Sequence, residues 1–159
     1  MKEFLIIFFT QIVFGHFLQC ITCVIWLSVF DKNRLNKKLF WILSLSLTVS
    51  TYLVRLLPIR FGIHTLLSII FVVLISIWML QISVNKSVFI GLGATLLITI
   101  SEILSYLIFV LIIGEENFKI INGVESLYRY VAGDVGALIF FTFVVSFYWY
   151  KKKRKRDKI

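Results

Sequence analysis

Apolar runs as long as a membrane is thick dominate this sequence. Residues 65–84 contain no formal charge, and only Asn85 and Lys86 separate them from the next apolar run. An α-helix needs about 20 consecutive apolar residues to cross the hydrocarbon core of a bilayer. Runs of similar length recur along almost the whole chain, so we expect an all-α integral membrane protein.

The apolar runs leave little chain outside the membrane. Sixty per cent of the 159 residues are hydrophobic, against roughly 45–50% in an average soluble domain. We expect one membrane domain, residues 1–150, followed by a basic tail, residues 151–159. The two-residue link at Asn85 and Lys86 requires antiparallel neighbours. The predicted membrane helices are residues 4–30, 39–57, 65–84, 87–113 and 128–150.

The distribution of Lys and Arg predicts the orientation of the five helices. With the C-terminus inside the cell, the inner segments 31–38, 85–86 and 151–159 hold twelve of these residues, and the outer segments hold four. Cytoplasmic loops carry the excess of positive charge in membrane proteins. We therefore expect a multi-pass protein of the cell membrane with its N-terminus outside and its C-terminus in the cytoplasm.

The basic tail follows directly after the last apolar run. A basic run in that position indicates anchoring to anionic lipid headgroups rather than binding to nucleic acid. We expect anionic lipids as partners and no nucleic acid. The anchoring residues are Lys151, Lys152, Lys153, Arg154, Lys155 and Arg156.

Residues 55–64 form neither a regular helix nor a polar loop. Pro58 cannot continue the hydrogen bonds of a helix that is already under way, and Gly62 loosens the backbone again. Backbone freed at membrane depth must be buried in protein or face water. We favour a broken, partly re-entrant connection at the outer face; a simple external turn with two interfacial arginines is the alternative.

His16 and Glu102 are ionisable residues deep within predicted spans. Such residues are costly in lipid and often line a functional cavity. By the helical rise, His16 lies roughly 18 Å and Glu102 roughly 16 Å from the outer ends of their helices. Because the two depths match, a contact between His16 and Glu102 is geometrically feasible. The alternative is that polar residues only hold helices together.

Asp134 lies closer to the outer face, roughly 9 Å below the start of its helix. Long basic side chains can extend along a helix toward such a depth. We therefore expect an outer cluster in which Asp134 meets Arg55, Arg60 or His64. Together with His16 and Glu102, these residues are the candidates for ligand binding or coupling.

No motif for catalysis, metal binding or cofactor binding occurs in the chain. Cys20 and Cys23 share one helix face but lack the second cysteine pair that a membrane redox enzyme needs. His16 and Cys20 are close enough to touch, but a thiolate is disfavoured in an apolar helix. We interpret the cysteines as packing residues and expect a protein without enzyme activity, metal or cofactor.

Small residues mark two sites of close helix packing. Spacings of four residues between small side chains let helix backbones approach each other. The partner is another helix of this chain or a second copy, and the sequence does not separate these. The small residues are Ala132, Gly133, Gly136 and Ala137 on the last helix, and Gly91, Gly93 and Ala94 on the fourth.

Residues 55–65, RLLPIRFGIHT, precede an apolar span, a short link and a span that carries Ser101 and Glu102. This arrangement resembles the membrane sensor region of bacterial receptor histidine kinases of the accessory-gene-regulator type, which belong to the GHKL group. Arg60 departs from the pattern, because a neutral residue, often proline, stands there in that group. The resemblance covers residues 54–113. The matching residues are Pro58, Phe61, Gly62, Ile63, His64, Thr65, Ser101 and Glu102.

The resemblance implies a sensing module without kinase activity. Those kinases continue into a dimerisation helix with a phospho-acceptor histidine and an ATP-binding domain, whereas this sequence ends at Ile159. Such a module can pair with a histidine kinase or another membrane protein, capture a signal, or form half of a split receptor. It can also be a piece of a longer receptor.

We therefore hypothesise a sensor-like or regulatory membrane module that recognises a signal or a partner protein. One alternative is a small transporter or substrate-binding subunit, in which Glu102, Asp134 and His16 line a site at mid-membrane depth. The other is a structural subunit, which joins a larger complex or a homo-oligomer through its small-residue faces.

Overall fold

The structure, a computed structural model, is all-helical in the residues it describes, which confirms the all-α prediction. It describes residues 15–30, 35–56, 63–114, 116–117 and 127–156. A π-helical turn at residues 15–17 leads into the first helix. The helices are α2 (Leu18–Phe30), α3 (Lys37–Leu56), α4 (Ile63–Leu80), α5 (Val84–Ile113) and α7 (Leu127–Arg156).

The link between α4 and α5 lies at residues 81–83, earlier than the predicted link at Asn85 and Lys86. Gln81 has a φ of 51°, a left-handed backbone that ends the right-handed helix α4. The Ser87 N–H then donates to the Ser83 carbonyl at 3.0 Å, which closes the first turn of α5. Asn85 and Lys86 are therefore exposed residues of this first turn, because polar side chains at a helix end reach solvent without unwinding the backbone.

Helix α7 continues to Arg156 and so includes most of the predicted tail. Lys and Arg are good helix formers, and their charges are favourable near a helix C-terminus. The Lys151 Nζ donates to the Val29 carbonyl at 2.9 Å and lies 4.5 Å from the centre of the Phe30 ring. The basic run thus begins in contact with the last turn of α2.

Several predictions fall outside the described residues. The first predicted helix began at residue 4, and the description starts at residue 15. The description also lacks residues 57–62, which contain most of the predicted re-entrant connection. It lacks residues 118–126 as well, which belong to the predicted outer segment between the last two helices. These parts of the sequence analysis stay predictions.

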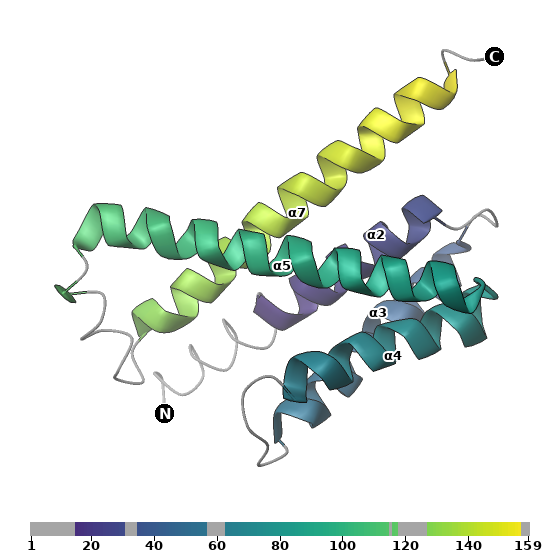
Figure 1. Cartoon of the computed structure of the whole chain (residues 1–159), viewed down its shortest axis with the longest axis horizontal. Coiled ribbons are helices and arrows are strands. Elements are labelled where there is room, and N and C mark those ends of the chain that lie inside the picture. Colours follow the sequence, from purple (N-terminus) through teal and green to yellow (C-terminus); the bar gives the residue numbers. More distant parts are fainter. Residues whose placement is uncertain (1–14, 31–34, 57–62, 115, 118–126, 157–159) are drawn as a thin grey trace.

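Helix α2 lies at the centre of the packing, against α3, α5 and α7, while α4 packs on α3 and α5. Figure 1 shows α5 running across the molecule, with α7 crossing it and extending beyond it toward the C-terminus. The core is mainly apolar, and Thr22, Ser44 and Ser76 are also fully buried. Its most deeply buried hydrophobic members are Val24, Leu27, Leu43, Leu47, Phe140 and Val144.

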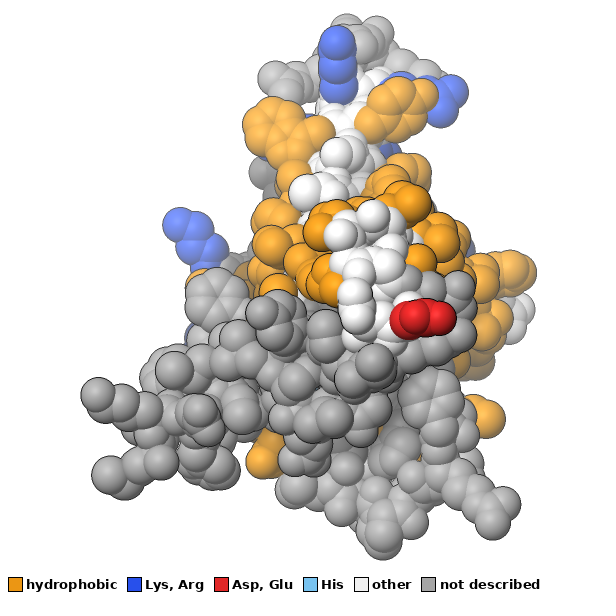
Figure 2. Space-filling model, turned by 90° about the vertical axis from the view of Figure 1, so that its left-hand side faces the viewer, with side chains coloured by type: hydrophobic (Ala, Val, Ile, Leu, Met, Phe, Trp, Pro, Cys, Tyr) orange, Lys and Arg blue, Asp and Glu red, His pale blue; other side chains and the backbone are white. Residues whose placement is uncertain are grey.

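The outer surface carries many large apolar side chains. Trp78 is 86% exposed, Leu111 84% and Phe89 78%. Figure 2 shows hydrophobic side chains over much of the described surface on this side, with Lys and Arg at the top, where α7 ends. Among the described residues, Val84–Ile113 and Gly133–Arg154 are long and apolar enough to cross a membrane; the apolar helices Gly15–Phe30 and Leu66–Leu80 are shorter.

Small residues of α7 pack against α5 of the same chain. Gly136 and Ala137 are buried. A Cβ added at Gly136 would lie 3.7 Å from the Ser101 carbonyl oxygen, from the Glu102 Cα and from the Ser105 Cβ. Gly133, in contrast, has open space beside it. The close α5–α7 crossing is thus one that the small-residue spacing predicted, with a helix of this chain as the partner.

Candidate ligand-binding cavity

A cavity of about 480 Å³ lies among α2, α3, α4 and α5. This volume is within the range of roughly 300–1,000 Å³ that is usual for small-molecule sites. Leu47, Ile69, Val72 and Ile98 supply apolar walls. Apolar walls with a few polar groups are typical of sites that bind small organic ligands.

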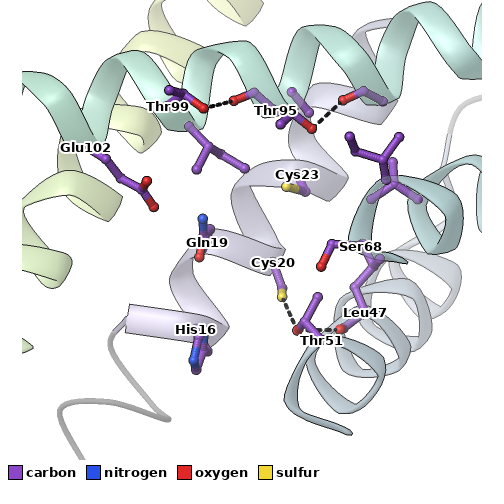
Figure 3. Close-up of a pocket in the computed structure, with 15 residues that line it drawn as sticks. His16, Gln19, Cys20, Cys23, Leu47, Thr51, Ser68, Thr95, Thr99 and Glu102 are labelled. Carbon is purple, nitrogen blue, oxygen red and sulfur yellow. Dashed lines mark hydrogen bonds between the residues drawn. The ribbon is translucent and has the colours of Figure 1, made fainter. Parts of the chain in front are cut away.

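The structure places His16 and Glu102 at the same cavity. His16 is half-buried in the turn before α2, and Glu102 is an exposed residue of α5. Figure 3 shows the Glu102 side chain pointing from α5 toward α2, where Gln19 lies, with His16 in the turn before Gln19. The two residues that the sequence predicted at matched depth thus line one cavity, and their role there stays a prediction.

The α5 wall carries oxygen atoms at helical spacing. Thr95, Thr99 and Glu102 follow one another at intervals of four and three residues, which places them on one helix face. The Thr95 Oγ1 donates to the Gly91 carbonyl at 3.0 Å, and the Thr99 Oγ1 donates to the Thr95 carbonyl at 3.0 Å. A hydroxyl has a single proton, so both oxygens present only lone pairs to a ligand.

The facing wall, from α2 and α3, has its own hydrogen bonds. The Thr51 Oγ1 donates to the Leu47 carbonyl at 2.8 Å and lies 3.6 Å from the Cys20 Sγ. The Thr51 Oγ1 also lies 3.1 Å from the Thr48 carbonyl, and either the thiol or the hydroxyl can be the donor between Cys20 and Thr51. Cys20 and Cys23 are buried and form no disulfide, and both also line the cavity.

The predicted outer cluster around Asp134 stays a prediction. Arg60 and the side chains of Arg55 and His64 lie outside the described part of the chain. Asp134 is half-buried on α7 and is not among the residues that line the cavity. Its helix packs chiefly on α5 and α2.

The basic residues lie away from the cavity, at the end of α7. Lys152, Lys153 and Arg154 are exposed, and the side chains of Lys155 and Arg156 are outside the description. Lys151 is half-buried against α2. The exposed positions are available to a charged surface such as lipid headgroups.

Sequence reasoning missed several polar residues of the cavity. Gln19, Thr51, Ser68, Thr95 and Thr99 all line it. The stripe of Thr95, Thr99 and Glu102 was visible in the sequence, since three polar residues recur at helical spacing in an apolar run. Nothing in the sequence paired that stripe with Thr51, because helix neighbours depend on the tertiary packing.

No protein-family model, curated protein or solved structure matches the chain. In the part of the chain that the structure describes, no three His, Cys, Asp or Glu side chains are grouped as metal ligands. The functional interpretation therefore depends on the cavity, the helix packing and the distribution of charge.

Proposed function

We propose that this chain is a multi-pass protein of the cell membrane with five membrane helices, its N-terminus outside and its C-terminus in the cytoplasm. The apolar outer surface supports membrane embedding. The C-terminal ends of α2 and α7 and the N-terminal ends of α3 and α5 all lie toward the right-hand side of Figure 1, with α7 extending beyond the others. This arrangement supports the orientation given by the excess of Lys and Arg.

Within that membrane protein, the cavity among α2, α3, α4 and α5 is the site of a sensor-like or regulatory module that recognises a small ligand. The observation that carries this proposal is the meeting of His16 and Glu102 in one cavity. Ionisable residues within membrane helices cost free energy to insert. Their convergence on a space of ligand size favours a binding site over helix packing alone.

The packing around Glu102 gives the cavity a route to the basic end of the chain. Gly136 of α7 lies against the turn of α5 that carries Ser101 and Glu102, and α7 also packs on α2. Helices α2 and α5 both line the cavity. A ligand that shifts α5 relative to α2 would change the position of α7, whose far end carries the basic run.

The two residues of the Ser101-Glu102 pair face different parts of the structure. Ser101 is buried beside α7, and Glu102 lines the cavity. This division supports the sensor proposal, because one turn of α5 then joins the proposed ligand site to α7. On this proposal, the partners are anionic lipids at the end of α7 and a histidine kinase or another membrane protein.

Filling the cavity tests the binding function. The Ala94→Leu variant adds volume at a buried cavity wall, and Thr142→Leu adds a leucine at an exposed position of α7 as the control. Each variant is purified from bacterial membranes in mild detergent, and the small molecules that co-purify are measured by mass spectrometry. We expect one or more molecules to be lost from Ala94→Leu only. Identical molecules from all three proteins would contradict the proposal.

A small transporter is the second candidate, favoured by the depth of the cavity. Glu102 lies roughly 16 Å from the end of α5 by the helical rise, near mid-membrane, where transporters bind their substrates. Uptake of the co-purifying molecule into liposomes, lost in Glu102→Gln, would establish transport. Binding without uptake would leave the sensor function.

A further inference from the structure

We propose that the cavity binds an organic ammonium ion, a primary amine on a short apolar body, with its charged group at Glu102 and Thr99. This inference rests on the proposed function, since it names the chemical class of the ligand. It follows from which hydrogen-bonding atoms the walls present, and from the charge of the lining.

The described walls are rich in acceptors. The hydroxyl protons of Thr51, Thr95 and Thr99 all go to carbonyl groups of their own helices. The oxygens of Thr95 and Thr99 can therefore only accept hydrogen bonds from a ligand. Thr51 also contacts the Cys20 thiol, which leaves the α5 wall as the main acceptor surface.

Glu102 extends this surface with a carboxylate one turn beyond Thr99. An ionised carboxylate accepts several hydrogen bonds at once, and an ammonium group carries three N–H donors and no acceptor. Hydrogen bonds between such charged groups are about twice as strong as neutral ones. The donors of an ammonium ion thus match the acceptors of Thr99 and Glu102.

The charge of the described lining favours a cationic ligand over an anionic one. Its one carboxylate is Glu102, none of its residues is Lys or Arg, and its one basic side chain is His16. A carboxylate or phosphate ligand would face Glu102 and the threonine oxygens, and like charges repel strongly in a site of low dielectric constant. A neutral alcohol would lack the charge–charge attraction to the Glu102 carboxylate.

The remaining walls fit an apolar body on the amine. Figure 3 shows Leu47 of α3 across the cavity from Thr99 and Glu102. Ile69 and Val72 of α4 also line the cavity. Burial of apolar surface stabilises a complex by about 25 cal/mol per Å². A ligand with an ammonium head and a short hydrocarbon tail therefore satisfies both sides of the cavity.

Three probes with the same six-carbon body test this assignment: n-hexylammonium, n-hexanol and n-hexanoate. The full chain is reconstituted in nanodiscs of neutral phosphatidylcholine, so that the lipid charge does not attract the amine. Binding is measured by titration calorimetry and by the shift in unfolding temperature. We expect n-hexylammonium to bind most tightly, and Glu102→Gln to weaken its binding by roughly tenfold or more.

Two further variants separate a site effect from a folding effect. Thr99→Val removes one acceptor at nearly constant volume and should weaken n-hexylammonium binding severalfold without affecting n-hexanol. Glu116→Gln, at an exposed position outside the cavity lining, should leave the binding of n-hexylammonium unchanged. Thr99→Val keeps the test decisive if Glu102→Gln does not fold.

Equal binding of n-hexanoate or n-hexanol, or unchanged n-hexylammonium binding in both Glu102→Gln and Thr99→Val, would overturn the ammonium assignment. Binding of n-hexanol that is lost in Ala94→Leu would overturn the assignment while still supporting a ligand cavity. Failure of all three probes would also overturn it. The proposed function would then be decided by the co-purifying molecules.

Discussion

At the scale of single residues, several buried hydroxyl groups form hydrogen bonds to the backbone of their own helix. The buried hydroxyls of Thr22, Ser44 and Ser76 each donate to a carbonyl four residues earlier on their own helix. A polar group left without a partner in an apolar interior would cost several kcal/mol by transfer scales. These local bonds explain how polar residues fit into apolar helices.

Trp26 makes a hydrogen bond between helices. Its Nε1 donates to the Ile90 carbonyl at 3.1 Å, and its ring lies where a Cβ on Gly93 would come within 3.2 Å. We expect Trp26→Phe to lower the free energy of unfolding by about 1 kcal/mol, because the donor is lost while the aromatic ring stays. Unfolding by titration with SDS in mixed micelles measures this change.

The matched control is Trp78→Phe, since Trp78 is 86% exposed. We expect it to leave the free energy of unfolding nearly unchanged. Equal losses in the two variants would contradict the role given to the Trp26 hydrogen bond.

Gln81 has a backbone conformation that a glycine would adopt at lower cost. A left-handed residue other than glycine costs roughly 1–2 kcal/mol, while glycine loses roughly 0.5–1 kcal/mol of extra backbone entropy on folding. We expect Gln81→Gly to raise the free energy of unfolding slightly and Gln81→Val to lower it by about 1 kcal/mol. Unfolding of both variants by SDS titration measures the sign of each change in the free energy of unfolding. A loss of stability in Gln81→Gly would contradict the φ of 51°.

At the scale of elements, the crossing of α5 and α7 decides how the cavity connects to the rest of the molecule. Ser101 and Ser105 are almost completely buried, and Gly136 lies opposite them. Small side chains on both helices let the backbones approach closely. The turn that carries Glu102 is therefore packed directly on α7.

A pair of cysteines tests this crossing. A Cβ at position 136 would lie 3.7 Å from the Ser105 Cβ, and disulfides form at Cβ separations of about 3.5–4.5 Å. We expect Ser105→Cys with Gly136→Cys to form a disulfide rapidly under mild oxidation, in a background in which Cys20 and Cys23 are replaced by Ala. The product is measured as a mobility shift after proteolysis in the loop between α5 and α7.

The control pair is Ser105→Cys with Gly133→Cys. A Cβ at position 133 has no atom within 4 Å among the described residues, so we expect little disulfide from it. Equal yields from the two pairs would contradict the crossing.

At the scale of the whole molecule, the proposed membrane embedding rests on an apolar exterior and a basic end of α7. Exposed apolar side chains cover α3, α4, α5 and α7, and the exposed Lys152, Lys153 and Arg154 extend the end of α7. Anionic lipid attracts such residues by about 1 kcal/mol each near the surface.

Reporter proteins fused after Ile159 test the proposed orientation. We expect green fluorescent protein to fluoresce there and alkaline phosphatase to be inactive, because twelve Lys and Arg residues belong to the predicted inner segments and four to the outer ones. Both activities are measured in whole bacterial cells. An active phosphatase at that position would overturn the orientation.

The sequence by itself determined the helical class and most helix ends, because both depend on nearby residues. Apolar runs placed α3 and α5 within three residues of their observed starts, and Gly136 indicated a close crossing. The local signal failed at Gln81, whose left-handed backbone the sequence did not reveal, and beyond residue 150, where basic side chains continue α7.

Only the tertiary structure decided which polar residues share a site. Equal depth along their helices made a contact between His16 and Glu102 feasible. Depth does not determine how each helix is rotated about its axis or which helices pack together. The packing of α2 among α3, α5 and α7 placed these two residues at one cavity with Thr51 and Thr99. Local spacing and polarity fix a helix, whereas its neighbours are fixed by side-chain shape across residues far apart in the chain.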